Sequence, residues 1–210
     1  MIRIAIASVT VVLMLSGIVQ AGVLATDAAA YVDGTSRVWH GSTDMDSGIT
    51  VNGLHLQATV DWCVYAPGAF HFDGYTPTPG EFVYAYQVDV TGTSVVKLFT
   101  VALLDENKAD NIGSFALGTG VAPAASYFEQ PGSPDLLAAE FEWTPAEVAG
   151  LTSGLVFSSI NAPMDWVGNL ADSGQTADGT VPSPSNAIPE PATLGILTIG
   201  LLGWVSRRRR

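Results

Sequence analysis

Residues 54–65 read LHLQATVDWCVY, and apolar and polar side chains alternate along this stretch. The first set of alternate positions is apolar and consists of Leu54, Leu56, Ala58, Val60, Trp62 and Val64. The second set is mostly polar and consists of His55, Gln57, Thr59, Asp61, Cys63 and Tyr65. Because successive side chains of a β-strand point to opposite faces of a sheet, this period of two predicts a strand with one buried face.

Strand patterns continue on the C-terminal side of this stretch. Residues 81–90 (EFVYAYQVDV) place a second apolar set on one face, namely Phe82, Tyr84, Tyr86, Val88 and Val90. A short turn at residues 91–93 leads into residues 94–104, so these two runs are predicted to pair as a hairpin. Further strands are predicted at residues 127–130, 136–143 and 155–160, with weaker signals at 38–40 and 49–51.

Helical signals are scarce in the middle of the chain. Residues 144–150 predict one short helical turn, because Thr144 can cap it and Glu147 completes a capping box. The polar residues 105–111 predict a loop. Many short strands with no crossover helix between them favour an all-β fold, an antiparallel β-sandwich or jelly roll, for residues 26–170. Residues 171–188 are rich in small polar residues and predict a flexible linker.

The N-terminus has the three-part layout of a secretory signal peptide. Arg3 precedes an apolar run over residues 4–19, and the small Ala21 stands before the predicted cut, so the signal spans residues 1–21. A second candidate cut follows Ala25. The apolar run is short for an uncleaved anchor, which is the alternative interpretation. We therefore expect export through the Sec translocon and cleavage by signal peptidase.

Charge is distributed unevenly along the chain. The whole sequence holds 20 acidic and 8 basic residues, a formal net charge of -12. Arg3 and the four C-terminal arginines leave three basic residues against 19 acidic ones in residues 22–188, and 3 − 19 gives -16. A surface this acidic repels phosphate backbones, so nucleic acid is excluded as a partner.

Local catalytic motifs are missing from the sequence. There is no Gly-x-Ser-x-Gly elbow and no phosphate loop, and His40, His55 and His71 lack metal-site spacing. Cys63, the single cysteine, lies within the first predicted strand and is expected to be an inert packed residue. We therefore expect no enzyme. A secreted hydrolase with a site assembled from distant residues is the third interpretation.

Two groups of residues are candidates for ligand contacts. The acidic loops offer weak calcium candidates, for which ordinary solvated turns are the alternative: Asp44, Asp46, Asp105 and Asp110. The loop at residues 66–80 carries Phe70, Phe72 and Tyr75, aromatic rings of the kind that stack on sugars. A loop folded back on its own aromatics is the alternative for this second group. No other cofactor is expected.

The C-terminus combines three features in a fixed order. Pro189, Glu190 and Pro191 are followed by a mostly apolar helix over residues 192–206 and then by a basic stop, Arg207, Arg208, Arg209 and Arg210. Fifteen helical residues span roughly 22 Å, which is short against a hydrocarbon core of about 30 Å. A core helix is disfavoured because the terminal charges must stay in water. A plain anchor and a processed signal are the interpretations that stay open.

Residues 189–210 closely resemble the PEP-CTERM sorting signal of Gram-negative bacteria. The resemblance implies recognition by an exosortase, a membrane protease that cuts near the Pro-Glu-Pro motif while the helix holds the protein in the inner membrane. It also implies release or attachment at the cell surface, and an association with exopolysaccharide and biofilm. The arginines on the cytoplasmic side agree with the positive-inside rule.

These features together predict an exported, acidic β-sandwich that is sorted to the cell surface or the extracellular matrix. The expected role is non-catalytic, that of a structural or adhesive component. A carbohydrate-binding module that uses Phe70, Phe72 and Tyr75 is the second interpretation. The expected partners are the translocon, signal peptidase, exosortase, the membrane during sorting, and exopolysaccharide.

Overall fold

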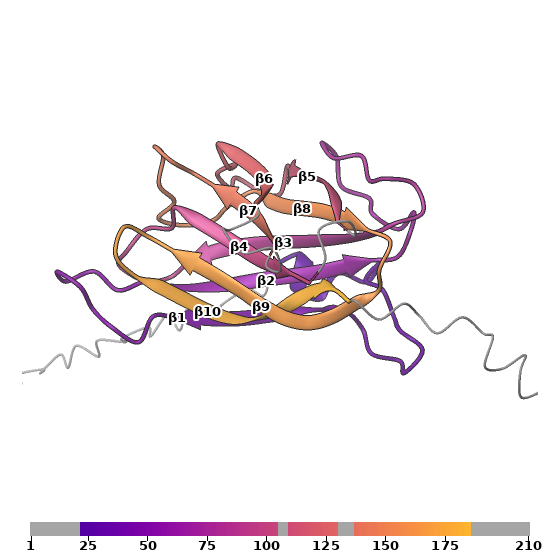
Figure 1. Cartoon of the computed structure of the whole chain (residues 1–210), viewed down its shortest axis with the longest axis horizontal. Coiled ribbons are helices and arrows are strands. Elements are labelled where there is room, and N and C mark those ends of the chain that lie inside the picture. The colour runs from indigo at the N-terminus through magenta and orange to yellow at the C-terminus, as the bar shows by residue number, and fades with distance from the viewer. Residues whose placement is uncertain (1–21, 105–108, 130–136, 186–210) are drawn as a thin grey trace, which may run out of the picture.

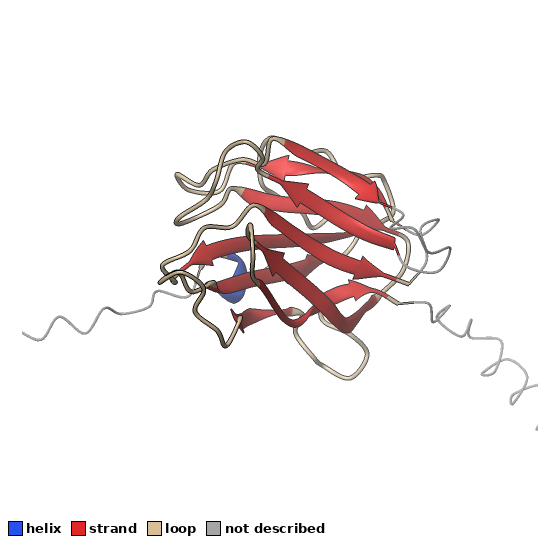
Figure 2. Ribbon diagram, turned by 60° about the vertical axis from the view of Figure 1, so that its left-hand side comes forward, coloured by secondary structure: helices blue, strands red, loops and turns tan. Residues whose placement is uncertain are grey.

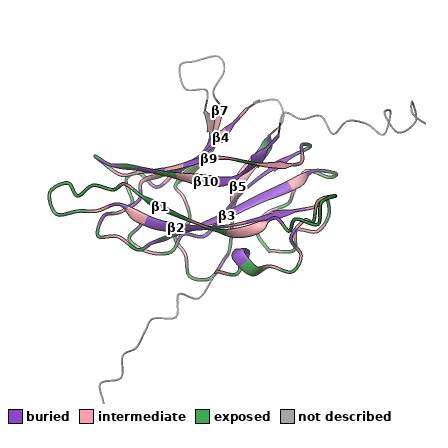
Figure 3. Ribbon diagram, turned by 90° about the horizontal axis from the view of Figure 1, so that it is seen from below, coloured by how far each residue is buried: buried purple, intermediate pink, exposed green. Residues whose placement is uncertain are grey.

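A computed structural model of the chain describes residues 22–104, 109–129 and 137–185. Within them, ten strands form two sheets (Figures 1 and 2), and a single 3-10 turn, η1 (Leu24–Thr26), lies on the side of the first sheet that faces away from the second (Figure 3). The strands are β1 (His40–Asp46), β2 (Gln57–Tyr65), β3 (Phe82–Val90), β4 (Leu98–Leu103), β5 (Asp110–Phe115), β6 (Ala125–Glu129), β7 (Leu137–Glu142), β8 (Gly154–Ser159), β9 (Pro163–Ala171) and β10 (Thr176–Pro184).

The two five-stranded sheets lie face to face (Figure 3). The strand order is β1-β2-β3-β8-β5 in the first sheet and β10-β9-β4-β7-β6 in the second, and every neighbouring pair is antiparallel. The predicted all-β sandwich is therefore confirmed. The two flanking helices that the sequence predicts lie outside the described residues. No helix in the described part of the chain is long and apolar enough to cross a membrane.

The interior between the sheets contains the apolar faces that the sequence predicts. Leu56, Ala58, Val60 and Val64 are fully buried there. From β3 the same interior receives the predicted set Tyr84, Tyr86, Val88 and Val90, with Phe82 packed partly buried against it. Trp62 is half-buried, whereas Leu54 precedes the strand and is 48% exposed. The second sheet contributes fully buried aromatic rings of Phe99, Phe141 and Trp143.

The outer face of the first sheet carries a second apolar cluster. Cys63 and Tyr65 belong to the face predicted to be polar, yet both are fully buried. Leu24 of η1 covers them from the N-terminal side, and the aromatic loop at residues 66–80 packs onto the same cluster. The first sheet is therefore buried on both faces at this end, because segments before and after β2 fold over it.

The predicted hairpin between residues 81–90 and 94–104 is wrong. β3 pairs with β2 and β8 in the first sheet, while β4 pairs with β7 and β9 in the second. The connection crosses from one sheet to the other, and its Gly92 amide donates to the Gln57 carbonyl at 2.9 Å. Both strands carry a large apolar face, and packing the two faces against each other across the sandwich buries more of them than pairing edge to edge.

Two predictions for non-strand segments are also wrong in part. Residues 144–150 form no helical turn, because Val148 pairs with Val96 through backbone hydrogen bonds of 2.8 and 3.0 Å and is buried. In the predicted polar loop at 105–111, Asp110 and Asn111 begin β5, whereas residues 105–108 lie outside the described residues.

The predicted linker at residues 171–188 is contradicted by β10. Nine residues of β10 pair with nine of β9, from Thr176 opposite Ala171 to Pro184 opposite Pro163. Ala177 and Val181 of β10 are buried in the interior. β10 also lies beside β1, where the Thr43 hydroxyl donates to the Thr180 carbonyl at 2.5 Å. The folded domain therefore extends to Ser185, whose amide donates to the Ala162 carbonyl.

Candidate functional site

The candidate glycan residues lie in the apolar cover of the first sheet. The Phe70 ring centroid is 5.2 Å from that of Phe115 and 5.6 Å from that of Tyr75, both edge-on. Phe72 is stacked by His71 at 4.3 Å, and Phe115 lies 5.1 Å from it. The rings thus contact one another and the sheet. This placement favours a role in core packing over a role as an exposed surface on which a sugar ring could stack.

The calcium candidates do not come together. Asp44 and Asp46 lie on β1 and Asp110 on β5, which are the two opposite edges of the first sheet, and Asp105 lies outside the described residues. Among residues 22–104, 109–129 and 137–185 there is no group of three or more His, Cys, Asp or Glu side chains that could hold a metal ion.

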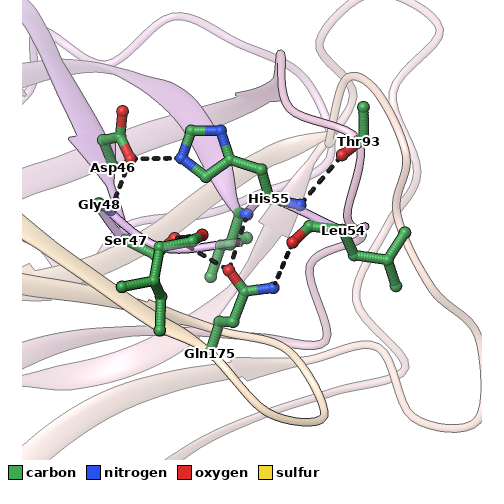
Figure 4. Close-up of polar contacts among 9 residues, drawn as sticks. Asp46, Ser47, Gly48, Leu54, His55, Thr93 and Gln175 are labelled. Atoms are coloured by element: carbon green, nitrogen blue, oxygen red, sulfur yellow. Dashed lines mark hydrogen bonds and ion pairs between the residues drawn. The ribbon is translucent and has the colours of Figure 1, made fainter. Parts of the chain in front are cut away.

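One end of the sandwich has a polar arrangement centred on Gln175 (Figure 4). Its side-chain oxygen accepts hydrogen bonds from the Ser47 hydroxyl at 2.9 Å and the Leu56 amide at 3.3 Å. Its side-chain nitrogen donates to the Leu54 carbonyl at 3.0 Å. Gln175 is only 5% exposed. One side chain from the β9–β10 loop therefore holds both ends of the β1–β2 loop.

Asp46, Ser47 and His55 meet at the same end and are the residue types of a catalytic triad. The Asp46 carboxylate is 2.6 Å from His55 Nε2, and it accepts the Gly48 amide hydrogen at 2.7 Å. These bonds, that of Gly48 first, lower the pKa of Asp46. The Ser47 hydroxyl, however, contacts Gln175 and the Ile49 carbonyl. The hydrogen bonds therefore do not join the serine to the histidine, as nucleophilic catalysis requires.

A shallow pocket of about 400 Å³ opens beside Gln175. It is lined by Ser47, Ile49, Asp172, Ser173, Gly174, Gln175 and Thr176. Burial acts to raise the pKa of Asp172, but hydrogen bonds from Ser94, Gly174 and Gln175 outweigh it, so the pKa is lowered. The same bonds hold the β9–β10 loop in shape. Most of the polar groups that line this pocket are thus already used in hydrogen bonds within and between the loops.

A second polar cluster joins loop 66–81 to β5 and β8. Asp110 accepts hydrogen bonds from the hydroxyls of Thr78 and Ser158, both at 2.8 Å. Glu81 is buried beside it, and its Oε2 has no hydrogen-bond partner. Burial raises the pKa of Glu81, with the neighbouring Asp110 acting in the same direction and Ser158 against it. The sequence did not single out Glu81, because its partners come from three separate segments.

A pocket of about 380 Å³ lies on the outer face of the second sheet. Tyr127 of β6 is 37% exposed there, and Glu140 and Glu142 of β7 stand on the same face. Burial and these two carboxylates raise the pKa of Tyr127 to about 12. Lys97, which is paired with Glu147 at 2.8 Å, closes one side. A tyrosine ring beside carboxylates and an ammonium is a combination that can hold sugar hydroxyls.

The lone cysteine and the histidines occupy separate environments. Burial raises the pKa of Cys63 to about 12, so its thiol is unreactive in the folded state. His40 contacts the Ala25 carbonyl through Nδ1 at 2.5 Å, His55 contacts Asp46, and His71 is 3.5 Å from Asp27. The predicted sorting residues Pro189, Glu190, Pro191 and Arg207 to Arg210 lie outside the described residues.

A family model decides how the C-terminus is interpreted. Residues 187–210 match the PEP-CTERM protein-sorting motif. The suspected resemblance is therefore confirmed for this segment, and the motif supports an exported protein that an exosortase sorts to the cell surface. No curated protein and no solved structure shows a significant match to the chain. The motif begins two residues after Ser185, the end of the described fold.

Proposed function

We propose that this chain is a non-catalytic component of the cell surface or extracellular matrix of a Gram-negative bacterium. It enters the Sec translocon, loses its signal peptide to signal peptidase, and is held in the inner membrane until exosortase acts. Its place is beside the exopolysaccharide of a biofilm. The observation that carries the proposal is the sorting motif at residues 187–210, which follows closely after β10, the last strand of the described β-sandwich.

The arrangement of the domain supports this order of events. All ten strands of the described residues precede the motif, so a cut near Pro189 to Pro191 removes no paired residue of β10. The polar cluster around Gln175 uses its hydrogen bonds to connect loops. An acidic, well-packed sandwich of this kind suits a scaffold that must stay soluble among polysaccharides after release.

The test is the intact mass of the protein isolated from its native host. We expect the mature protein to lack about its last twenty residues, because exosortase substrates are cut near the motif. A variant with alanine at Pro189, Glu190 and Pro191 is expected to retain its C-terminus and to accumulate in the inner membrane. Glu147→Ala, an exposed glutamate within the domain, is the matched control and leaves processing intact. A native protein that ends at Arg210 contradicts the proposal and makes the segment a plain anchor.

Glycan binding is the second candidate function, and the pocket beside Tyr127 favours it. Retention of the purified protein on the host's own exopolysaccharide, lost in Tyr127→Ala with the fold intact, would establish it. Phe72→Ala is the comparison, because Phe72 belongs to the aromatic loop that the sequence favoured. Loss of binding in Phe72→Ala alone would place the contact in that loop instead. If neither the wild type nor either variant is retained on the exopolysaccharide, glycan binding is contradicted and the scaffold role stands.

A further inference from the structure

Asp61 is an acidic side chain in an unusual place. It lies in the middle of β2, between Ser42 of β1 and Gln87 of β3, and it is only 9% exposed. Its Oδ1 accepts a hydrogen bond from the Ser42 hydroxyl. The Gln87 amide is used elsewhere, since its nitrogen donates to the carbonyls of Leu117 and Thr152. In the described part of the chain, Asp61 therefore has no cationic partner, although a buried carboxylate strongly favours one.

Gly22 lies directly against Oδ2, the second carboxylate oxygen of Asp61. A Cβ built on Gly22 would be only 1.9 Å from Asp61 Oδ2, so a side chain at this position would displace the Asp61 carboxylate. The backbone nitrogen of Gly22 is one bond from the same Cα, roughly 2.5 Å from that Cβ position. The nitrogen is consequently within about 4.5 Å of Oδ2. In the precursor this nitrogen is a neutral amide with a single hydrogen in a fixed direction.

We infer that signal peptidase cuts between Ala21 and Gly22 and that the new α-ammonium group of Gly22 forms a buried ion pair with Asp61. The inference rests on the proposed export of the chain. An α-amino group has an ordinary pKa of about 7.7–8.0 and is largely charged at neutral pH. Its three hydrogens rotate about the N–Cα bond toward Oδ2, whereas the single amide hydrogen of the precursor is held in the plane of its peptide bond. Removal of the signal thus supplies the cation that Asp61 lacks.

The same geometry argues against the alternative cut after Ala25. That cut would remove Leu24, which is fully buried in the second apolar cluster. It would also remove the Ala25 carbonyl, which His40 contacts at 2.5 Å. The η1 turn lies against β1, β2 and β3, so residues 22–25 are part of the folded domain. A chain beginning at Thr26 would leave both Asp61 and the apolar cluster uncovered.

The mass of the N-terminal peptide, measured on the protein purified from its native host, tests the position of the cut. We expect the mature chain to begin at Gly22. A chain beginning at Thr26 would overturn the inference while leaving the export proposal intact. A chain that still begins at Met1 would contradict the proposed cleavage by signal peptidase and would overturn the inference with it.

The ion pair is tested by a thermodynamic cycle on four exported proteins. These are the wild type, Asp61→Asn, a variant with Ser-Gly inserted between Ala21 and Gly22, and the combination. The insertion moves the terminal ammonium about 7 Å along the chain, and the mass confirms that the cut still follows Ala21. We expect Asp61→Asn to lower Tm by about 5 °C in the native background and by much less in the inserted one.

Two results would overturn the ion pair. One is an equal fall in Tm on Asp61→Asn in both backgrounds, and the other is an insertion that leaves the Tm of the Asp61 protein unchanged. The second comparison stands even if Asp61→Asn fails to fold. Asp89→Asn is the matched control, because it removes one exposed carboxylate from the neighbouring strand of the same sheet. Its Tm is expected to stay the same or rise.

Discussion

Gln175 makes hydrogen bonds that no local sequence pattern predicts. It lies 119 residues from Leu56 and 128 from Ser47 along the chain, yet it contacts both. The side-chain amide has one acceptor and one donor group, and here both are used. The loop between β1 and β2 contains three residues with left-handed backbone conformation, Gly48, Asn52 and Gly53, and most of its side chains are exposed. Gln175 therefore ties this loop to the β9–β10 loop, in addition to the hydrogen bonds that the β1–β2 loop makes within itself.

We expect Gln175→Ala to lower the free energy of unfolding by about 1–3 kcal/mol, because the Leu54 carbonyl and the Leu56 amide lose their partner. Urea unfolding followed by tryptophan fluorescence measures the change. Ser173→Ala is the matched control, since Ser173 belongs to the same loop but is exposed. Similar losses in both variants would show that Gln175 contributes no more than an exposed loop residue.

Glu81 gives the fold a pH dependence of predictable sign. Its pKa is raised above the ordinary 4.5, first by burial. A carboxyl group whose pKa is higher in the folded state binds its proton more tightly there. The free energy of unfolding therefore falls as the pH rises from the unfolded-state pKa through the folded-state pKa, and the full penalty is present above that window. The neutral Glu81→Gln avoids this penalty.

Glu81→Gln is accordingly expected to raise the free energy of unfolding at pH 7 and to change it little below pH 4.5. Urea unfolding at the two pH values provides the measurement. Asp73→Asn, at an exposed position of the same loop, is expected to have little effect at either pH. A Glu81→Gln effect of the same size at both pH values would mean that packing rather than ionisation is responsible.

At the level of the strands, sequence patterns found those with at least one strongly apolar face. β2, β3, β7 and β8 combine apolar side chains in runs or in alternation, and the residues 127–130 and 136–143 predicted as strands overlap β6 and β7. β9 and β10 were missed because glycine and proline interrupt both of them, and because β10 has few apolar side chains. Gly179 and Gly168 show why small residues are needed in these two strands. A Cβ on Gly179 would be 2.7 Å from Thr43 Cγ2, and one on Gly168 would be 2.9 Å from Val181 Cγ2.

The role of β10 as a strand can be tested by truncation. A chain that stops after Ser185 is expected to keep the Tm of the processed protein within about 2 °C. A chain that stops after Gly174 is expected not to fold, since it leaves β9 unpaired at the sheet edge and uncovers the interior around Leu170. Circular dichroism during heating distinguishes the two. A cooperative transition in the shorter chain would restore the linker interpretation of residues 171–188.

For the whole molecule, the dominant electrostatic feature is self-repulsion. Residues 22–188 hold three basic against 19 acidic residues, and 3 − 19 gives -16. Arg37 and Lys97 are both already paired, with Asp165 and Glu147. Like charges on a compact surface oppose folding, and dissolved salt screens them with a Debye length of about 8 Å at 0.15 M.

Raising NaCl from 10 to 200 mM is therefore expected to increase Tm by about 2–5 °C. Differential scanning calorimetry measures the shift, and a flat or falling Tm would contradict the expectation. CaCl₂ and MgCl₂ at equal concentration screen alike, so we expect equal shifts from the two salts. A larger shift with calcium would reveal a specific site, which the separation of Asp44 and Asp46 from Asp110 does not favour.

The class of fold and the sorting motif could be read from the chain alone, since both depend on local order. Alternation along residues 54–65 specifies a half-buried strand wherever it packs, and Pro189 to Arg210 form a linear signal. The pairing of β3 with β8, the burial of Glu81 and Gln175, and the contact of Gly22 with Asp61 depend on residues far apart in the chain. Such contacts form only when the two sheets pack against each other. The free energy gained by burying both apolar faces outweighs the local conformational preference of any single segment.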